Sequence, residues 1–210
     1  MRLTLILIAF CVIGYSVPFF LFSDMEVFYN TYGSSADSIA QRPYVLVTSI
    51  FMHGSLEHLL SNVLVLLFFG LALESELGWK RTAVIFFLGA LAGSAITAVI
   101  YPPDMIGIGA SAGIFALIGV GLIIPAEVPY YTMNPMPLAF LGIAYAVFNA
   151  FSFVAGIDPE VSYIAHFSGM AAGLALGAHI MKKNLRKNLP LIIATLAAMI
   201  MIPLLWIILS

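Results

Sequence analysis

Long runs of apolar residues, separated by short polar segments, make up most of the chain. Seven such runs lie near residues 3–22, 56–75, 81–101, 111–124, 136–156, 162–181 and 190–209. Most of them approach the roughly 20 residues that a helix needs to cross the hydrocarbon core of a bilayer. The first run follows Arg2 as a signal peptide would, but its length and the absence of a small-residue cleavage site favour a retained helix. The pattern predicts an all-α, polytopic membrane helix bundle.

Composition supports a membrane environment for nearly the whole chain. Of 210 residues, 62% are hydrophobic and only 9% are charged, and the mean hydropathy is +1.09. A soluble domain is about half apolar and roughly a quarter charged. The net charge of -2 gives no indication of nucleic-acid binding. The single cysteine, Cys11, lies in an apolar run and is expected to be a packing residue.

The distribution of basic residues predicts the orientation of the bundle. With a cytoplasmic N-terminus and seven crossings, only Arg42 falls on the outer side. The other lysines and arginines fall inside, as the positive-inside rule requires: Arg2, Lys80, Arg81, Lys182, Lys183, Arg186 and Lys187. The loop over residues 23–55 then lies outside and is the only sizeable segment expected beyond the membrane.

The fourth apolar run is too short to span the membrane alone. Fourteen helical residues rise about 21 Å, whereas the hydrocarbon core is about 30 Å thick. The run begins at Ser111, after the glycine-rich segment Gly107-Ile108-Gly109. That segment should enter the membrane as non-helical backbone, which is tolerated only inside protein or along a wet cavity. We therefore expect a water-accessible cavity that opens outward, with Ser111 at its floor.

A histidine is expected at the same depth on the sixth run. Asp104 precedes Ser111 by seven residues and Glu160 precedes His166 by six, so both pairs should sit similarly below the outer surface. Small residues then offer faces on which the two helices can approach closely: Gly169, Gly173 and Gly177 on one, and Ala112, Gly113 and Ala116 on the other. If these faces meet, the serine hydroxyl and the imidazole come within hydrogen-bonding reach.

A third cluster of polar residues lies just before the second run and in its first turns. Ser55 is a plausible N-cap, with Glu57 in the first turn of the helix. His58 and Asn62 follow four residues apart and share a helix face. Polar side chains are costly against lipid, so this face should point into the bundle.

Taken together, the three motifs resemble the rhomboid family of intramembrane serine proteases. The motifs are His-x-x-x-x-His-x-x-x-Asn, Gly-x-Ser and Ala-His-x-x-Gly-x-x-x-Gly, and they occur in the family's order. The matching residues are His53, His58, Asn62, Gly109, Ser111, Ala165, His166, Gly169 and Gly173. The resemblance covers the six runs from 3 to about 181, and the seventh resembles the six-plus-one arrangement of part of the family. Bacterial members often have glycine after the serine, where this chain has Ala112.

Chemistry and the resemblance together indicate a Ser-His dyad. No third member is expected, because no acidic residue lies near Ser111 or His166 on its own helix. Ser111 would be the nucleophile and His166 the general base. Phe115 would orient the imidazole by stacking. The oxyanion would be stabilised by His58, by Asn62 and by the Ser111 backbone N–H. His53, Gly109 and Gly169 would support the site, and Glu74 matches a family position with a structural role.

The resemblance also implies a domain division, a substrate class and a membrane location. Residues 1–181 would form the six-helix protease core, and residues 182–210 a basic cytoplasmic loop and a seventh helix. The substrates would be transmembrane proteins, cut near the extracytoplasmic face of the bilayer. Phe148, Phe151 and Phe153 resemble the lateral gate of the family, or they are lipid-facing bulk. No cofactor or metal is implied, and the oligomeric state is left open.

Three alternative functions fit the sequence less well. A metalloprotease is disfavoured because His53, His58 and His166 lack carboxylate or thiol partners at zincin-like spacing. A non-catalytic relative that binds membrane proteins normally lacks the serine or the histidine. A transporter would often show paired broken helices in two related halves, and only one broken segment is apparent.

Overall fold

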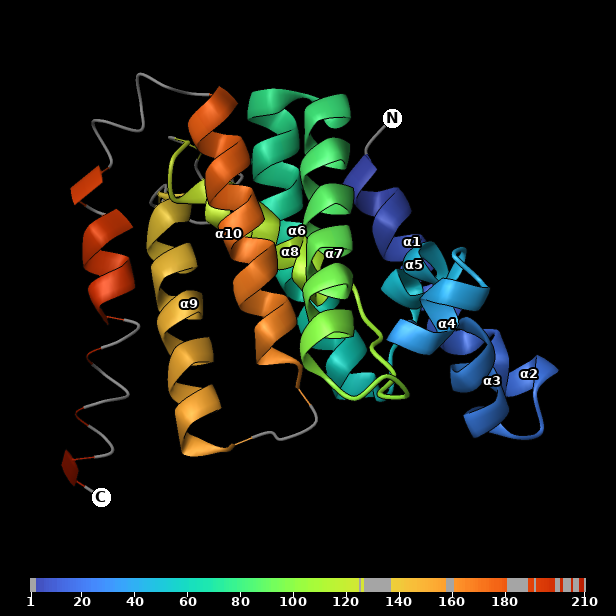
Figure 1. Ribbon diagram of the computed structural model, residues 1–210. Coiled ribbons are helices and arrows are strands. Elements are labelled where there is room, and N and C mark those ends of the chain that lie inside the picture. The colour runs from blue at the N-terminus through green and yellow to red at the C-terminus, as the bar shows by residue number, and fades with distance from the viewer. Residues whose placement is uncertain are drawn as a thin grey trace.

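The computed structural model describes residues 3–124, 126, 137–157, 161–180, 189–190, 192–198, 201, 205 and 208–209. The regular elements within these ranges are helical, apart from one isolated β-bridge, and Figure 1 shows their arrangement as a bundle. The elements are α1 (Leu3–Ser16), α2 (Pro18–Leu21), α3 (Met25–Tyr32), α4 (Ala36–Gln41), α5 (Val45–Thr48), the 3-10 helix η1 (Ser49–Phe51), α6 (Leu56–Leu77), α7 (Trp79–Ile100), α8 (Ser111–Gly121), α9 (Leu138–Ala155) and α10 (Tyr163–Ile180). The predicted all-α class is confirmed.

The helices follow the predicted apolar runs closely. Four segments among the described residues are long and apolar enough to cross a membrane: Leu3–Leu21, Leu56–Leu77, Trp79–Ile100 and Leu138–Ala155. The run predicted over 162–181 forms α10, whose 18 residues include two histidines and three glycines. The run predicted over 111–124 forms the short helix α8 and ends earlier, at Gly121. Of the seventh run, residues 192–198 are helical, and much of the remainder lies outside the described residues.

The first run is two helices rather than one. Proline has no backbone N–H and is favoured at the start of a helix, and Pro18 begins α2 directly after Val17. The beginning of α1 is tied to the far end of α6. The Glu74 carboxylate accepts hydrogen bonds from the backbone N–H groups of Leu3 and Thr4, at 2.8 and 2.9 Å, and from the Thr4 hydroxyl at 2.8 Å. This confirms a structural contact for Glu74.

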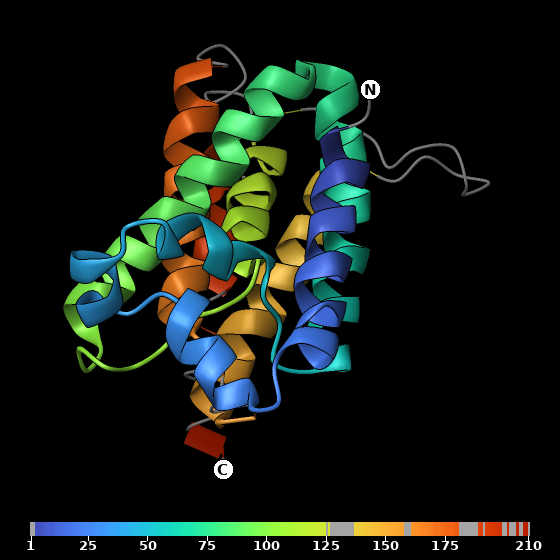
Figure 2. The ribbon, with the colours of Figure 1, turned by 90° about the vertical axis from the view of Figure 1, so that its right-hand side faces the viewer.

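Helix α8 is the centre of the bundle. It packs against α6, α7, α9 and α10 (Figures 1 and 2). Residues 112–121 are all buried. Eleven residues rise only about 17 Å, so α8 is much shorter than the helices around it. A helix that is apolar on every side is expected at such a fully enclosed position.

Glycines allow α8 and α10 to touch along their backbones. A methyl group built at Gly169 would collide with the carbonyl oxygen of Ala112, and one at Gly173 with that of Ala116. The predicted contact between the two small-residue faces is therefore present. Gly113, assigned to the same face of α8, instead packs against Phe86 of α7.

The loop over residues 23–55 folds into three short helices and the 3-10 helix. In its apolar part, Val45, Ile50 and Met52 are buried in the protein, whereas Tyr44 and Val47 are about half exposed, at 48% and 51%. The loop is therefore packed onto the bundle along one of its sides.

Candidate active site

One cavity of about 640 Å³ lies where α6, α8 and α10 begin and where α7 and α9 end. This size falls within the roughly 300–1,000 Å³ typical of ligand pockets. The lining includes most of the predicted site residues, among them His58, Asn62, Ser111, Phe115 and His166. It also includes Asn149, which was not predicted. The cavity is at the opposite end of α6 from Glu74 and hence from the start of α1.

Ser111 is the first residue of α8, at the wall of this cavity. Ala110 precedes it as the N-cap and has no side chain that could cap the helix. The first helical backbone bond runs from the Ile114 N–H to the Ala110 carbonyl, at 3.0 Å. The N–H groups before Ile114 therefore have no acceptor within the helix, and with the helix dipole they favour negative charge beside Ser111.

The segment that leads to Ser111 is non-helical, as predicted, and hydrogen bonds with the loop over residues 23–55 hold it. Gly107 and Ser34 exchange backbone hydrogen bonds of 3.0 and 2.7 Å. The Gly109 N–H donates to the Ser49 carbonyl at 2.8 Å. Irregular backbone needs such partners when it is removed from water. The loop over residues 23–55 thus fixes the segment that leads to the serine.

Gly109 could not be replaced by a larger residue without strain. Its φ of +114° is one that side chains disfavour. A methyl group at this position would also lie only 2.8 Å from His58 Nε2. The glycine brings the segment before Ser111 directly against the His58 ring, which accounts for the Gly-x-Ser spacing.

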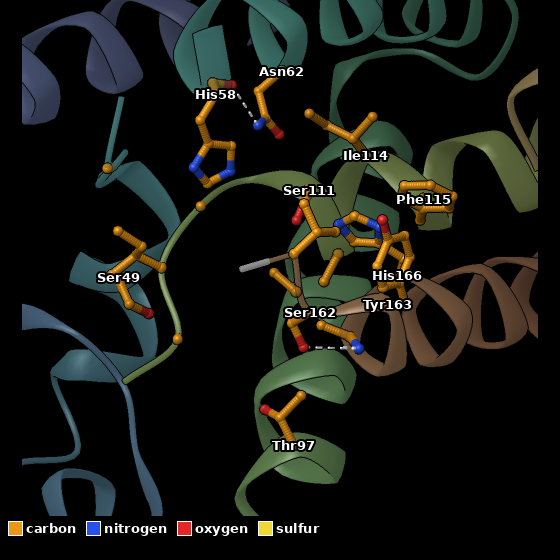
Figure 3. Close-up of a pocket in the computed structure, with 18 of the residues that line it drawn as sticks. Ser49, His58, Asn62, Thr97, Ser111, Ile114, Phe115, Ser162, Tyr163 and His166 are labelled. Atoms are coloured by element: carbon orange, nitrogen blue, oxygen red, sulfur yellow. Dashed lines mark hydrogen bonds between the residues drawn. The ribbon is translucent and has the colours of Figure 1, made fainter. Parts of the chain in front are cut away.

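His166 lies one turn into α10 and its ring is stacked on Phe115. The two ring centroids are 4.3 Å apart and the planes differ by 12°, so the predicted stacking is present. Figure 3 shows Ser111 beside His166, with His58 and Asn62 directed toward the same space. Within the described residues, no hydrogen bond joins the serine hydroxyl to the imidazole. Catalytic hydrogen bonds often form fully only when substrate is bound.

The predicted dyad has a neighbour that sequence analysis missed. His166 Nδ1 lies 2.7 Å from the side-chain oxygen of Asn149 on α9. Asn149 is only 5% exposed. A third member was not expected because no acidic residue lies near Ser111 or His166 on its own helix, whereas this amide lies on another helix. An asparagine within an apolar run was the available signal, because such a residue is costly against lipid.

His58 and Asn62 occupy the first two turns of α6. Ser55 caps this helix as predicted, and its hydroxyl accepts the His58 N–H at 3.1 Å. The Asn62 amide donates one hydrogen bond to the His58 carbonyl at 2.8 Å. An amide nitrogen carries two hydrogens, so the second is available to a group in the cavity.

His53 lies behind His58 and is 2% exposed. The two ring centroids are 4.9 Å apart, and His53 Nδ1 lies 3.3 Å from the Phe51 carbonyl oxygen. Burial, reinforced by the neighbouring His58, lowers the pKa of His53 to about 4, against the opposing effect of the Phe51 carbonyl. His53 is therefore neutral at physiological pH and supports His58 as an uncharged ring.

The fold and site together define a class of protein, namely a polytopic membrane protein whose central short helix begins at a serine in the wall of a cavity. The Rhomboid domain family model matches residues 40–183. The chain belongs to the rhomboid family. With four helices able to cross a bilayer, family membership supports an integral, multi-pass membrane protein.

Named relatives agree with this assignment. Rhomboid-like protease 2 of Toxoplasma gondii is 32% identical over 133 residues, which cover 63% of this chain and 46% of that protein. YdcA of Bacillus subtilis (strain 168), named as a candidate rhomboid protease, is 30% identical over 145 residues, covering 68% of this chain and 69% of YdcA. Inactive RHOMBOID-like protein 8 of Arabidopsis thaliana is 29% identical over 145 residues, covering 69% of this chain and 40% of the relative.

These relatives set a limit on what family membership implies. The match spans less than half of the Toxoplasma and Arabidopsis proteins. The similarity also extends to a relative named as inactive. Activity must therefore be argued from the side chains in the cavity.

Proposed function

We propose that this chain is an intramembrane serine endopeptidase that uses Ser111 and His166 as a catalytic pair. The observation that carries the proposal is the meeting of Ser111, His166, His58 and Asn62 in one cavity. Such a combination of nucleophile, base and hydrogen-bond donors fits acyl transfer. The apolar packing of this bundle gives no other reason to bring four polar side chains together.

Acylation begins at the Ser111 hydroxyl. His166 Nε2 accepts the hydroxyl proton while Oγ attacks the carbonyl carbon of the scissile peptide bond. The resulting tetrahedral intermediate collapses as the imidazolium returns the proton to the leaving amine. The products of this step are an acyl-Ser111 ester and a free amine.

Charge on the tetrahedral oxygen is stabilised at the start of α8. The Ser111 N–H lies at the positive end of the helix dipole, and the second amide hydrogen of Asn62 and the His58 ring line the same cavity. One donor of this kind typically contributes about 10²–10³ in rate. Gly109 contributes indirectly, because it lets the loop and His58 approach each other.

Hydrolysis of the ester requires water within the membrane-buried bundle. The cavity is continuous with the loop end of the bundle, where Ser34 and Ser55 are among its lining residues. His166 then removes a proton from water, the hydroxide attacks the acyl carbon, and the proton passes to Ser111 Oγ. The peptide acid leaves and the enzyme is regenerated.

The proposed topology places the cavity on the extracytoplasmic side. Lys80 and Arg81 begin α7 at the end of the bundle opposite the cavity, and the start of α1 is tied to the same end through Glu74. The positive-inside rule then assigns that end to the cytoplasm. We accordingly propose that residues 1–181 form the protease core, and that residues 182–210 add a basic cytoplasmic segment and a seventh helix.

The proposed substrates are other transmembrane proteins. A helix hides its carbonyl groups in hydrogen bonds, so a transmembrane substrate must unwind locally before Ser111 can reach it. Phe148 and Phe153 of α9 are 61% and 51% exposed, and Phe148 also lines the cavity. Their exposure is compatible with contact with either lipid or an entering substrate helix.

The proposal is tested by cleavage of a model single-pass membrane protein in detergent. Wild type is compared with Ser111→Ala, His166→Ala and the cavity control Ser94→Ala, at equal yields of folded protein. Both dyad variants should lose at least about 10³-fold in rate, and Ser94→Ala should stay within about twofold. Cleavage that survives in Ser111→Ala would refute the assignment of the nucleophile.

A further inference from the structure

We infer that Asn149 is a positioning residue that holds the His166 imidazole in the tautomer with its proton on Nδ1. The inference deepens the proposed function and rests on it. It assigns α9 a part in the chemistry, in addition to its place in the wall of the cavity. The observation behind it is the contact of 2.7 Å between Asn149 Oδ1 and His166 Nδ1.

Stacking alone does not fix the position of the His166 ring. Phe115 lies nearly parallel to the imidazole and sets its plane. A ring held only by stacking can still turn within that plane, because the contact has no preferred in-plane direction. The hydrogen bond from α9 supplies that direction, since it anchors one ring nitrogen to a buried amide.

The amide oxygen also selects the tautomer. Neutral imidazole carries one proton, on either Nδ1 or Nε2. Because an amide oxygen only accepts hydrogen bonds, the nitrogen that faces it must be the protonated one. Nδ1 therefore carries the proton and donates to Asn149, and Nε2 keeps the lone pair that must accept the Ser111 proton. The opposite tautomer could not act as the base.

A neutral acceptor suits this location better than a carboxylate. Asn149 is buried within an apolar helix, where an unpaired negative charge would be expensive. The titratable groups that face this region are Tyr145 on α9, Tyr163 on α10, Tyr101 after α7, and His58 and the exposed Glu57 on α6. From α8, the Ser111 hydroxyl lines the same cavity and the uncharged Phe115 ring stacks on the imidazole. The imidazole therefore takes its orientation from an uncharged partner.

The most direct test is the ¹⁵N chemical shift of the His166 ring in detergent-solubilised protein. The signal is assigned by its loss in His166→Gln, which separates it from the other histidines. Wild type should show a protonated Nδ1 and an unprotonated Nε2. Asn149→Leu should shift the ring toward the Nε2-protonated form, whereas Ser152→Ala, one turn further along α9, should leave the wild-type pattern. A protonated Nε2 in wild type, or an unchanged tautomer in Asn149→Leu, would overturn the inference.

Kinetics provide a second measurement, which would not change in this way if Asn149 had a merely structural role. Asn149→Leu should lower kcat by at least about tenfold with little change in KM, because the loss falls on proton transfer. Asn149→Asp keeps an acceptor at the same place and should retain most activity at high pH. Its carboxylate favours the imidazolium, so the acid limb of its pH-rate profile should move to higher pH by about one unit.

The two readouts separate failure of this inference from failure of the proposed function. If folded wild type cleaves nothing while its tautomer still depends on Asn149, the endopeptidase proposal fails and the positioning role stands. If wild type is active and Asn149→Asp has an unshifted acid limb, the positioning role fails and the endopeptidase proposal stands. Because Asn149→Asp preserves shape, this second result is informative even if Asn149→Leu does not fold.

Discussion

The two sides of the candidate active site are built differently. On one side, α8 meets α7 and α10 through backbone contacts at Gly89, Gly169 and Gly173. On the other side, α9 packs less extensively against α8 and α10. It reaches them through side chains, such as the Tyr145 ring on Phe115, with centroids 5.6 Å apart, and the Phe153 ring on Tyr163 at 5.5 Å.

This difference separates two structural requirements of the proposed reaction. The start of α8 and the helix that carries His166 are fixed by backbone packing, which tolerates little displacement. The orientation of the His166 imidazole depends instead on a side-chain hydrogen bond between its Nδ1 and Asn149 of α9. The nucleophile should therefore be held rigidly, while the state of the base should respond to changes in α9.

The largest effect should come from a methyl group added on the tightly packed side. In Gly173→Ala the new Cβ would collide with the Ala116 carbonyl of α8. Overpacking against backbone should cost about 3 kcal/mol, and the melting temperature in detergent should fall by roughly 6–12 °C.

Gly142→Ala is the matched control on the α9 side. Its Cβ would meet the ends of two flexible side chains, Leu122 at 3.2 Å and Ile118 at 3.4 Å. The cost should be below about 1 kcal/mol. Equal melting temperatures for the two variants would show that the two sides are packed alike.

A smaller effect is expected at the segment before the serine. Gly109→Ala combines an unfavourable φ with a collision against His58 Nε2. The rate of cleavage should fall about 10²-fold, equivalent to about 2.7 kcal/mol, with little loss of global stability. Gly54→Ala is a suitable control, because its Cβ would lie 3.6 Å from Ile108, an ordinary contact. A Gly109→Ala enzyme with wild-type kcat would contradict the proposed role of this backbone.

The smallest of these effects is a pH dependence of stability that arises at His53. Its pKa falls from an ordinary value of 6.5 to about 4 on folding. Above pH 6.5 the ring is neutral in both the folded and the unfolded state, so it adds no pH dependence to the stability. Below pH 6.5 the unfolded chain takes up the proton before the folded protein does. Stability is therefore lost as the pH falls from 6.5 toward 4, by about 2 kcal/mol at pH 5.

A variant with a side chain at position 53 that does not titrate separates the contribution of His53 to this pH dependence from the contributions of other groups. His53→Gln should lose less melting temperature than wild type between pH 7 and pH 5, with the difference measured in the same detergent. If the two proteins lose the same amount, His53 is not buried as a neutral ring.

Hydropathy was sufficient to locate the four segments that are long and apolar enough to cross a membrane, because each long apolar run forms its own hydrogen bonds and needs no distant partner. The start of α8 at Ser111 also followed from local features, namely the glycine-rich segment and the short apolar run. The break at Pro18 was missed, because hydropathy alone treats residues 3–22 as one run, although proline interrupts or begins helices.

Contacts between helices were harder to predict. Gly113 was assigned to the face that meets α10 but packs on Phe86 of α7, because α8 is apolar on all sides and its sequence does not distinguish them. Asn149 was missed for a related reason. Spacing along one helix does not reveal which side chain of another helix will lie beside His166.

The central claim is that Ser111 is a nucleophile activated by His166. It is tested most directly by treating the folded protein with a fluorophosphonate and mapping the adduct by mass spectrometry. Ser94 and Ser162 line the same cavity and serve as internal controls. The account predicts an adduct on Ser111 alone, lost in His166→Ala and retained in Ser94→Ala. An unlabelled Ser111 in folded wild type, or equal labelling of Ser162, would contradict it.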